Sequence, residues 1–321
     1  QIGIPYFQVV GLGLLFNTLS MSAGAVLRGS GDTKSPMYIN ILANVINIAG
    51  NYTLIFGHFG MPRLGVTGAG LATTFSRFVA MLLFFFLIYS GKRVVKLTLR
   101  DNYRFNWPLI QRISKIGSNA AIEQLVMRGG QIAFARVVAG LGTTTFAAHQ
   151  IALNVLSLSF MPGQAFGMSA TTLVGQSLGA KDPTLAERCG YEARRLGMIV
   201  ASFMGLVFFF GGGWIASLYT SDPEVIKYSA LALKIIALVQ PAQSTQFILA
   251  GGLRGAGDTR WPMYSTIMGV WVGRVLLSIL FVTYMGFGLV GAWAAMAIDQ
   301  LGRSMFISYR FKTGHWKKIK V

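Results

Sequence analysis

The stretch LRGSGDTKSPMY at residues 27–38 returns as LRGAGDTRWPMY at residues 253–264. Nine of the twelve positions are identical, and a constant offset of 226 residues separates the two copies. In each copy one apolar run ends at Leu-Arg-Gly and another begins at the Pro. A duplicated junction between apolar runs is typical of a membrane protein built from two related halves.

Each copy of this junction predicts a turn between two helices. Arg28 and Arg254 then lie at helix C-termini, where the helix dipole favours cations. Gly29 and Gly255 are the expected caps, because glycine closes a helix without steric cost. We therefore expect the junction to be a structural elbow rather than a ligand site.

The composition places the chain in a membrane. Of its 321 residues 53% are hydrophobic and 12% are charged, and the mean hydropathy is +0.56, whereas soluble domains carry about 25% charged residues. The net charge of +18 does not predict nucleic-acid binding, because the basic residues lie between apolar runs rather than on a soluble face. Cys189 has no second cysteine with which to form a disulfide or a metal cluster.

Nine apolar runs are long enough for a spanning helix, which needs about 20 residues. They lie at about 5–27, 36–57, 66–90, 114–139, 146–178, 192–213, 228–252, 262–285 and 289–310. One run precedes the first copy of the repeat and four precede the second, counted from the polar segment after residue 90. The sequence therefore predicts an all-α membrane protein of two related helical bundles, with nine of an expected twelve helices present and three missing ahead of Gln1.

The basic residues divide the chain and orient it. The expected parts are residues 1–90 as the last three helices of the first bundle, 91–107 as a basic cytoplasmic linker, 108–310 as a second six-helix bundle and 311–321 as a basic cytoplasmic tail. Lysine and arginine gather in alternate junctions, and the opposite junctions hold only Arg63 and Lys227. The positive-inside rule then predicts a multi-pass protein of the inner or plasma membrane with a cytoplasmic C-terminus.

A stripe of carboxamides marks the second apolar run. It consists of Asn40, Asn44, Asn47 and Asn51, spaced so that all four lie on one helical face. One interpretation is hydrogen bonding between helices, which asparagine supplies in membranes. The other is a site for a hard cation or a coupled proton, since amide oxygens are suitable ligands. The repeat favours the second, because the matching positions of the second half are Thr266, Val270, Gly273 and Leu277.

Two acidic residues fall inside apolar runs, where a charge is costly and usually has a role. Glu123 has Arg128 nearby and is open to two interpretations, a buried ion pair with an arginine or a cation- or proton-binding group. Asp299 is expected to be structural, paired with Arg303 four residues on or with Arg274 on the preceding helix.

Further polar and pliable side chains are candidates for a substrate cleft. They are Asn44, Gln124, Met127, Gln150 and Asn154. Each has a packing alternative, and for Met127 lipid or core contact is the simpler explanation. No nucleotide-binding, serine-hydrolase or zinc-protease motif occurs in the sequence, so no enzyme, cofactor or metal centre is predicted.

The motifs together resemble one known family, the multidrug and toxic compound extrusion (MATE) transporters. The resemblance covers essentially the whole chain and rests on both repeat copies and on four further motifs. These are NYTLIFG at 51–57, MPRLGVTGAGLAT at 61–73, AAHQIALN at 147–154 and MPGQAFGMSATTLVGQSLGA at 161–180. It implies two six-helix bundles facing a central cleft, and export of cationic or amphipathic compounds in exchange for Na+ or H+. The lipid bilayer and a small-molecule substrate are the implied partners, with no obligate protein partner.

The resemblance also implies site residues. The first-bundle cation site of one branch falls on Asn47, Asn51 and Thr73, although the second of these is often aspartate in that branch. A further aspartate of that site would lie ahead of Gln1. Another branch uses a glutamate at the position of Met127, and Glu123 lies one turn earlier on a similar face.

The predicted function is a secondary active antiporter that works by alternating access. Two alternatives remain. A lipid-linked saccharide flippase of the same superfamily would need a more cationic cavity, for which Arg128, Arg136 and Arg274 are available. A non-transporting membrane scaffold or receptor would show no ion-dependent flux.

Overall fold

The chain forms two compact units of helices. The computed structural model describes residues 3–91, 95, 98 and 105–319, and the chain divides into Gln1–Arg104, here unit 1, and Phe105–Val321, here unit 2. Residues 92–94, 96–97 and 99–104 of the predicted linker, and 320–321 of the predicted tail, lie outside the described part. No strand occurs in the described residues, so the all-α class is confirmed.

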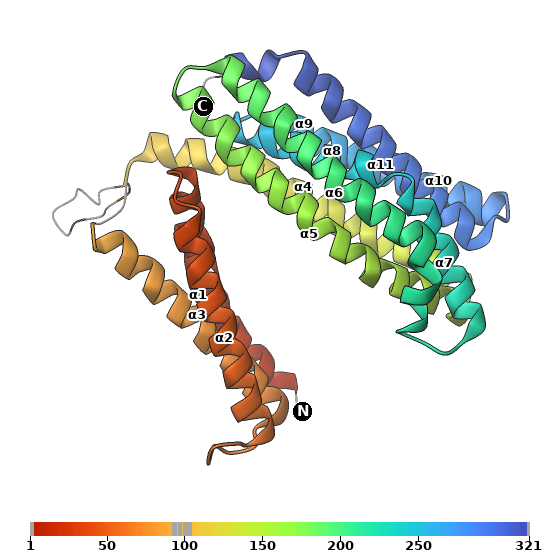
Figure 1. The fold of residues 1–321 in the computed structure, drawn as a ribbon, viewed down its shortest axis with the longest axis horizontal. Helices are drawn as coiled ribbons and strands as arrows, with labels where there is room; N and C mark the ends of the chain where they lie inside the picture. Colours follow the sequence, from red (N-terminus) through yellow and green to blue (C-terminus); the bar gives the residue numbers. More distant parts are fainter. Residues whose placement is uncertain (1–2, 92–94, 96–97, 99–104, 320–321) are drawn as a thin grey trace. The chain divides into compact units, whose positions relative to one another are not determined.

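Unit 1 contains α1 (Gly3–Gly29), α2 (Lys34–Phe56) and α3 (Gly65–Tyr89). Helix α3 packs against both α1 and α2 (Figure 1). Small residues bring the backbones together: a Cβ atom on Gly68 would lie 2.5 Å from the carbonyl oxygen of Leu54. The chain's asparagine stripe lies on α2, the helix that this close approach holds against α3.

Unit 2 contains the remaining helices. They are α4 (Trp107–Ala139), α5 (Thr143–Gly179), α6 (Pro183–Ser217), α7 (Pro223–Ala237), α8 (Gln240–Gly255), α9 (Arg260–Ile267), the π-helical η1 (Met268–Leu276), α10 (Leu277–Ile279), the π-helical η2 (Leu280–Tyr284), α11 (Gly288–Lys312) and the 3-10 turn η3 (His315–Lys318). Three of them begin with the same device. Asn106, Asp182 and Asp222 accept hydrogen bonds from backbone N–H groups of the first turn, and proline follows each cap within two residues.

The apolar run expected at 228–252 is broken in the middle. Helices α7 and α8 meet at an angle of 56°, and Pro241 stands in the first turn of α8. Proline cannot donate a backbone hydrogen bond and restricts the residue before it, so a helix ends there. The break turns the polar start of α8 into the interior of unit 2, where Gln240, Gln243 and Gln246 are buried.

Residues 260–284 form one rod in which two stretches have π-helical turns, η1 and η2. These wide turns are rare and often occur at functional sites. Gly269 and Gly273 of η1 lie directly against α11, and a Cβ on Gly273 would be 3.2 Å from the Cα of Asp299. This close packing places Arg274, also on η1, beside the same aspartate.

The repeated elbow has the same geometry in both units. In unit 1 the N–H of Asp32 bonds to the carbonyl of Leu27 and that of Gly31 to the carbonyl of Arg28, both at 3.0 Å. In unit 2 the N–H of Asp258 bonds to Leu253 at 2.8 Å and that of Gly257 to Arg254 at 3.0 Å. This pair of bonds is the Schellman motif.

The capping glycines are therefore Gly31 and Gly257, with φ of 96° and 81°. The expectation that Gly29 and Gly255 cap these helices was wrong. Both are the last helical residues, and the left-handed position comes two residues later.

The described residues form nine helical rods when the bent pair α7 and α8 is counted as one. They do not establish that all nine rods span a membrane. Six helices are long and apolar enough to cross a membrane, and the bent pair α7 and α8 makes up to seven. Helices α4 and α11 are long but carry several charged residues, among them Glu123, Arg128, Asp299 and Arg303.

The residues expected as a tail pack back on unit 2. Trp316 is fully buried, stacks on Phe311 with ring centroids 4.7 Å apart and donates its indole N–H to the Phe311 carbonyl at 2.8 Å. Lys317 forms an ion pair with Glu187 at 2.5 Å. Residues 313–319 thus belong to the packed structure of unit 2.

Candidate functional site

The predicted cation-site residues of unit 1 lie together. Asn51 donates from Nδ2 to Oδ1 of Asn47 at 3.1 Å, and Asn47 donates from Nδ2 to Oγ1 of Thr73 at 3.2 Å. Thr73 in turn donates to the carbonyl of Ala69 at 2.9 Å. The three side chains form a single relay between α2 and α3, which we call the amide relay.

The amide relay ends in a side-chain oxygen that is an unsatisfied hydrogen-bond acceptor among the described residues. Oδ1 of Asn51 is buried and accepts no hydrogen bond from the part of the chain that the structure describes. A buried acceptor without a donor is costly, and a proton donor or a hard cation would satisfy it. The relay itself is neutral, so any net negative charge for binding a cation has to come from another residue.

The stripe does not act as one unit. Asn40 and Asn44 are exposed on α2, whereas Asn47 and Asn51 are half-buried and bonded toward α3. The cleft candidate Asn44 therefore lies on an open face of unit 1. Asn47 supplies a hydrogen bond between the helices and Asn51 carries an unsatisfied acceptor, so the interpretation of the stripe as an ion site stays a prediction.

In unit 2, Glu123 is buried at 5% exposure and accepts two hydrogen bonds. Nη2 of Arg254 lies 2.6 Å from its Oε1, and Oγ1 of Thr266 lies 3.1 Å away. The nearer arginine in sequence, Arg128, instead donates to Oε1 of Gln131 at 3.2 Å. The elbow arginine Arg254 therefore links the repeated junction to a candidate site residue.

Asp299 pairs with both of the arginines that the sequence offered. Nη2 of Arg274 lies 2.6 Å from Oδ2, and Nε of Arg303 lies 2.7 Å from Oδ1. The three side chains are at most 6% exposed. Removing one member of such a network would leave a buried charge without compensation, so a structural role follows directly.

A cavity of about 850 Å³ lies in unit 2 between these two ionic groups. Its wall includes Glu123, Arg128, Arg254, Arg274 and Arg303. Its neutral polar residues are Gln124, Gln131, Gln164, Gln246, Gln300 and His149, and its apolar wall includes Met127, Phe134, Phe160, Phe247 and Met296. A cavity in which aromatic and aliphatic side chains meet convergent polar groups can hold a small molecule, and this one is richer in polar groups than most such sites. We call it the arginine cavity.

The predicted cleft residues of unit 2 separate into two pairs. Gln124 and Met127 line the arginine cavity with Glu123. Gln150 and Asn154 are exposed on α5 and are not among its lining residues. On α5 the lining residues are instead His149, Leu153, Phe160 and Gln164.

Sequence reasoning gave no weight to His149, which the structure buries to 1% exposure. Phe134, Phe146 and Trp293 surround its ring, with centroids 5.5, 6.2 and 5.7 Å away. Neither ring nitrogen has a hydrogen-bond partner within the described residues, although the side chain lines the arginine cavity. His149 lies in the AAHQIALN motif at 147–154, but a lone histidine has no partner residue to indicate its role, so only the tertiary contacts reveal its surroundings.

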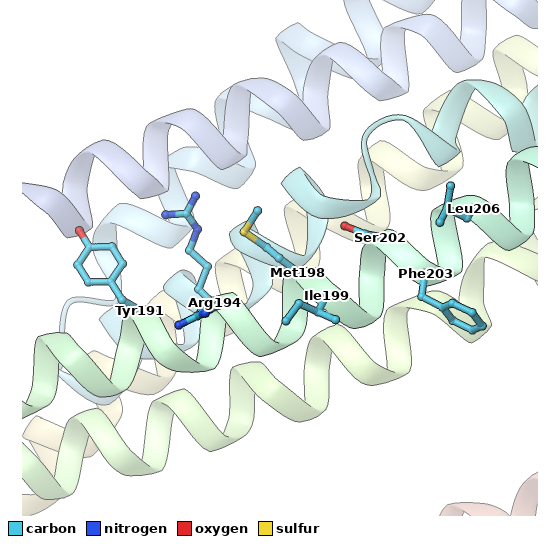
Figure 2. Close-up of a pocket in the computed structure, with 8 residues that line it drawn as sticks. Tyr191, Arg194, Met198, Ile199, Ser202, Phe203 and Leu206 are labelled. Atoms are coloured by element: carbon cyan, nitrogen blue, oxygen red, sulfur yellow. The ribbon is translucent and has the colours of Figure 1, made fainter.

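A second hollow, of about 580 Å³, follows one face of α6 (Figure 2). Its lining residues all come from this helix and are Tyr191, Arg194, Arg195, Met198, Ile199, Ser202, Phe203 and Leu206. Phe203 is 64% exposed and Leu206 58%. An apolar helical face of this kind suits contact with lipid chains and lacks the convergent polar groups of a binding site.

These features define a multi-pass helical membrane protein with buried ionic groups around a polar cavity, the class to which secondary transporters belong. Comparisons with known proteins agree. The MatE family model matches residues 1–53 and 120–295. A probable multidrug resistance protein NorM of Thermotoga maritima is 34% identical over 320 residues, covering 98% of this chain and 68% of that protein. The chain belongs to the MATE family and is a MATE transporter.

Further relatives are similar in extent. The uncharacterized transporter YisQ of Bacillus subtilis is 30% identical, with 97% of this chain and 68% of that protein covered. Among solved structures, a MOP superfamily transporter from Pyrococcus furiosus has a TM-score of 0.89 at 21% identity, over 98% of this chain and 70% of that one. A MATE structure in the bent conformation has a TM-score of 0.88 at 20% identity, over 97% and 69%. These two likenesses concern the fold.

Proposed function

We propose that the chain exports cationic or amphipathic drugs and metabolites in exchange for Na+ or H+. The observation that carries this proposal is a buried, ionisable Glu123 on the wall of a cavity that can hold a small molecule. The multidrug resistance proteins among its relatives support the efflux direction.

The mechanism is alternating access, in which the coupling ion and the substrate favour opposite states of the transporter. Each ligand moves this equilibrium only through its difference in affinity for the two states. A proton or Na+ at Glu123 would weaken the bond to Arg254, and an ion at the amide relay would satisfy Oδ1 of Asn51. An ion at Glu123 would thus replace an internal contact, whereas an ion at the amide relay would fill an unsatisfied acceptor.

The topology belongs to the same proposal. All nine helical rods cross the membrane, with α7 and α8 as one bent span, and supply nine of the twelve spans expected from the repeat. Residues 1–90 are then the last three helices of a first bundle, and 108–310 are a second bundle of six. The basic junctions, both elbows and the C-terminus face the cytoplasm of a cell whose plasma or inner membrane holds the protein.

The test is dye efflux from vesicles that contain the intact protein, under an imposed Na+ or H+ gradient. Gradient-dependent efflux is expected, and Glu123→Gln should alter its pH or Na+ profile. Glu192→Gln, which changes an exposed glutamate on α6, is the matched control. An unchanged profile in Glu123→Gln would return Glu123 to a structural role, and the absence of any gradient-dependent efflux would favour a scaffold or receptor.

A lipid-linked saccharide flippase is the second candidate, and the four arginines of the arginine cavity favour it. Such a substrate carries a pyrophosphate. Movement of a lipid-linked pyrophosphate across vesicles, without efflux of small amphipathic dyes, would decide for this candidate.

A further inference from the structure

The charges around the arginine cavity do not balance. Four guanidinium groups line it, from Arg128, Arg254, Arg274 and Arg303, together with a single carboxylate, Glu123. Asp299 stands behind the wall and binds Arg274 and Arg303. Counting both carboxylates, two positive charges remain without an acidic counterpart among the residues that the structure describes.

The excess charge belongs to the two more exposed arginines of the cavity, Arg128 and Arg254. Arg274 and Arg303 are almost fully buried and share Asp299. Arg254 is 34% exposed in its side chain and gives one Nη2 bond to Glu123. Arg128 is exposed and bonds to the neutral Oε1 of Gln131. A guanidinium has five N–H donors, so both Arg128 and Arg254 keep donors for a ligand.

Neutral donors extend this pattern. His149 lines the cavity with both ring nitrogens unpaired among the described residues, so it can donate one hydrogen bond to an oxyanion. The amide groups of Gln124, Gln164 and Gln246 are further donors on the wall. Phe134, Phe160 and Phe247 provide an apolar surface against which the rest of a ligand can pack.

Electrostatics in a membrane favour a negative occupant. Unpaired cations among apolar helices are costly, and they mark the pathways of ligands and ions. Guanidinium groups bind carboxylate, sulfonate and phosphate with two parallel hydrogen bonds. An organic cation in the same cavity would face the excess positive charge, and Glu123 could bind it only by releasing Arg254.

We infer that the arginine cavity binds amphipathic organic anions, with Arg128 and Arg254 holding the anionic group and the aromatic wall holding the apolar body. Glu123 competes with the anion for Arg254. The inference specifies a substrate class for the proposed function and rests on that function for transport of the anion. Binding of the anion can be measured without transport.

The test uses two xanthene dyes of similar shape and opposite charge. Fluorescein is a dianion in mildly alkaline buffer, and rhodamine 6G is a cation. Fluorescence anisotropy measures binding of each dye to the intact protein in lipid nanodiscs of phosphatidylcholine, without any gradient. Fluorescein should bind more tightly than rhodamine 6G, and added salt should weaken its binding.

Single substitutions test whether fluorescein binds at the proposed residues. Arg128→Gln should weaken fluorescein binding by about tenfold, which equals about 1.4 kcal/mol of binding free energy. Glu123→Gln should strengthen it by several-fold, because it releases Arg254. Arg112→Gln makes the same change as Arg128→Gln on the same helix, in a hollow elsewhere on unit 2, and should have no effect.

The two variants Arg128→Gln and Glu123→Gln are expected to change the affinity for fluorescein in opposite directions. Loss of folding cannot explain both results, since a misfolded Glu123→Gln variant would not gain affinity. Tighter binding of rhodamine 6G, weakened by Glu123→Gln, would overturn the inference, as would unchanged fluorescein binding in Arg128→Gln. Neither result would affect gradient-driven efflux, which tests the proposed function alone. Competition by phosphatidylglycerol in the nanodiscs would identify the anion as a lipid headgroup and support the anion site.

Discussion

The two units share an elbow but differ in the polar groups of the helix after it. The Schellman motif after Leu27 and after Leu253 has the same pair of backbone bonds. The helix after the first elbow carries a neutral relay of two asparagines toward Thr73. The rod after the second carries Arg274 into a buried ionic network with Asp299. Duplication thus preserved the turn, which is fixed by backbone geometry, while the polar interior of each unit diverged.

The largest expected effect is on the ionic network of unit 2. Asp299→Asn leaves Arg274 and Arg303 buried without a counter-charge and should destabilise the protein by about 3–5 kcal/mol. Thermal unfolding of the purified protein measures this. Glu192→Gln, an exposed acid-to-amide change on α6, should leave the melting temperature within error. An unchanged melting temperature in Asp299→Asn would contradict the view that unit 2 depends on a buried ionic network whereas unit 1 has a neutral relay.

Close packing inside unit 2 gives the next effect. A Cβ on Gly251 would collide with the carbonyl oxygen of Gly167 on α5. Gly251→Ala should therefore cost about 1–3 kcal/mol, although alanine normally favours a helix. Gly302→Ala is the control, because nothing lies within 4 Å of a Cβ there, and it should be neutral or stabilising. Equal melting temperatures for the two variants would mean that α5 and α8 can separate at no cost.

The shared elbow predicts that equivalent substitutions in the two units lower stability by equal amounts. Gly31 and Gly257 have left-handed φ values of 96° and 81°, where an L side chain is strained by about 1–2 kcal/mol. Gly31→Ala and Gly257→Ala should each lower stability by about that amount. Unequal losses would show that the two elbows are alike in backbone only and differ in their surroundings.

The smallest expected effect on stability is in the amide relay. Asn51→Leu removes one hydrogen bond and the unsatisfied Oδ1, so the free energy of unfolding should change by less than about 1.5 kcal/mol. The same variant should nevertheless weaken ion-coupled efflux. Asn44→Leu, an exposed position of the same helix, is the control for both measurements. Loss of expression in Asn51→Leu would instead support hydrogen bonding between helices as the main role of the stripe.

The sequence predicted the helices well because an apolar run is a local signal. Junctions such as Lys-Asp-Pro and Ser-Asp-Pro marked the starts of α6 and α7, where Asp182 and Asp222 do cap the helix. The contact of Asn47 with Thr73 followed from the family resemblance and is present in the structure. These features depend on residues close in sequence or on motifs of known order.

The rest depended on tertiary contacts that no local pattern encodes. Arg254 lies 131 residues from Glu123 in the chain, and the nearer Arg128 was the more obvious partner. The π-helical turns of η1 have no recognisable sequence signal, yet they place Arg274 beside Asp299. His149 and Gln246 became candidates through the cavity that they line. The excess of arginine in this cavity was also not apparent from the sequence, because its four arginines come from four separate segments of the chain.

The central claim is that a neutral, ion-linked centre in unit 1 and an anion-binding centre in unit 2 serve one transport cycle. The most direct test is efflux from vesicles holding the intact protein, with a Na+ or H+ gradient imposed and Asn51→Leu compared with Arg128→Gln. We predict that Asn51→Leu loses the gradient dependence of efflux while binding fluorescein normally, and that Arg128→Gln binds fluorescein weakly while its remaining dye efflux still depends on the gradient. If both variants lost both properties together, or neither lost either, the two centres would not be separate and the account would be wrong.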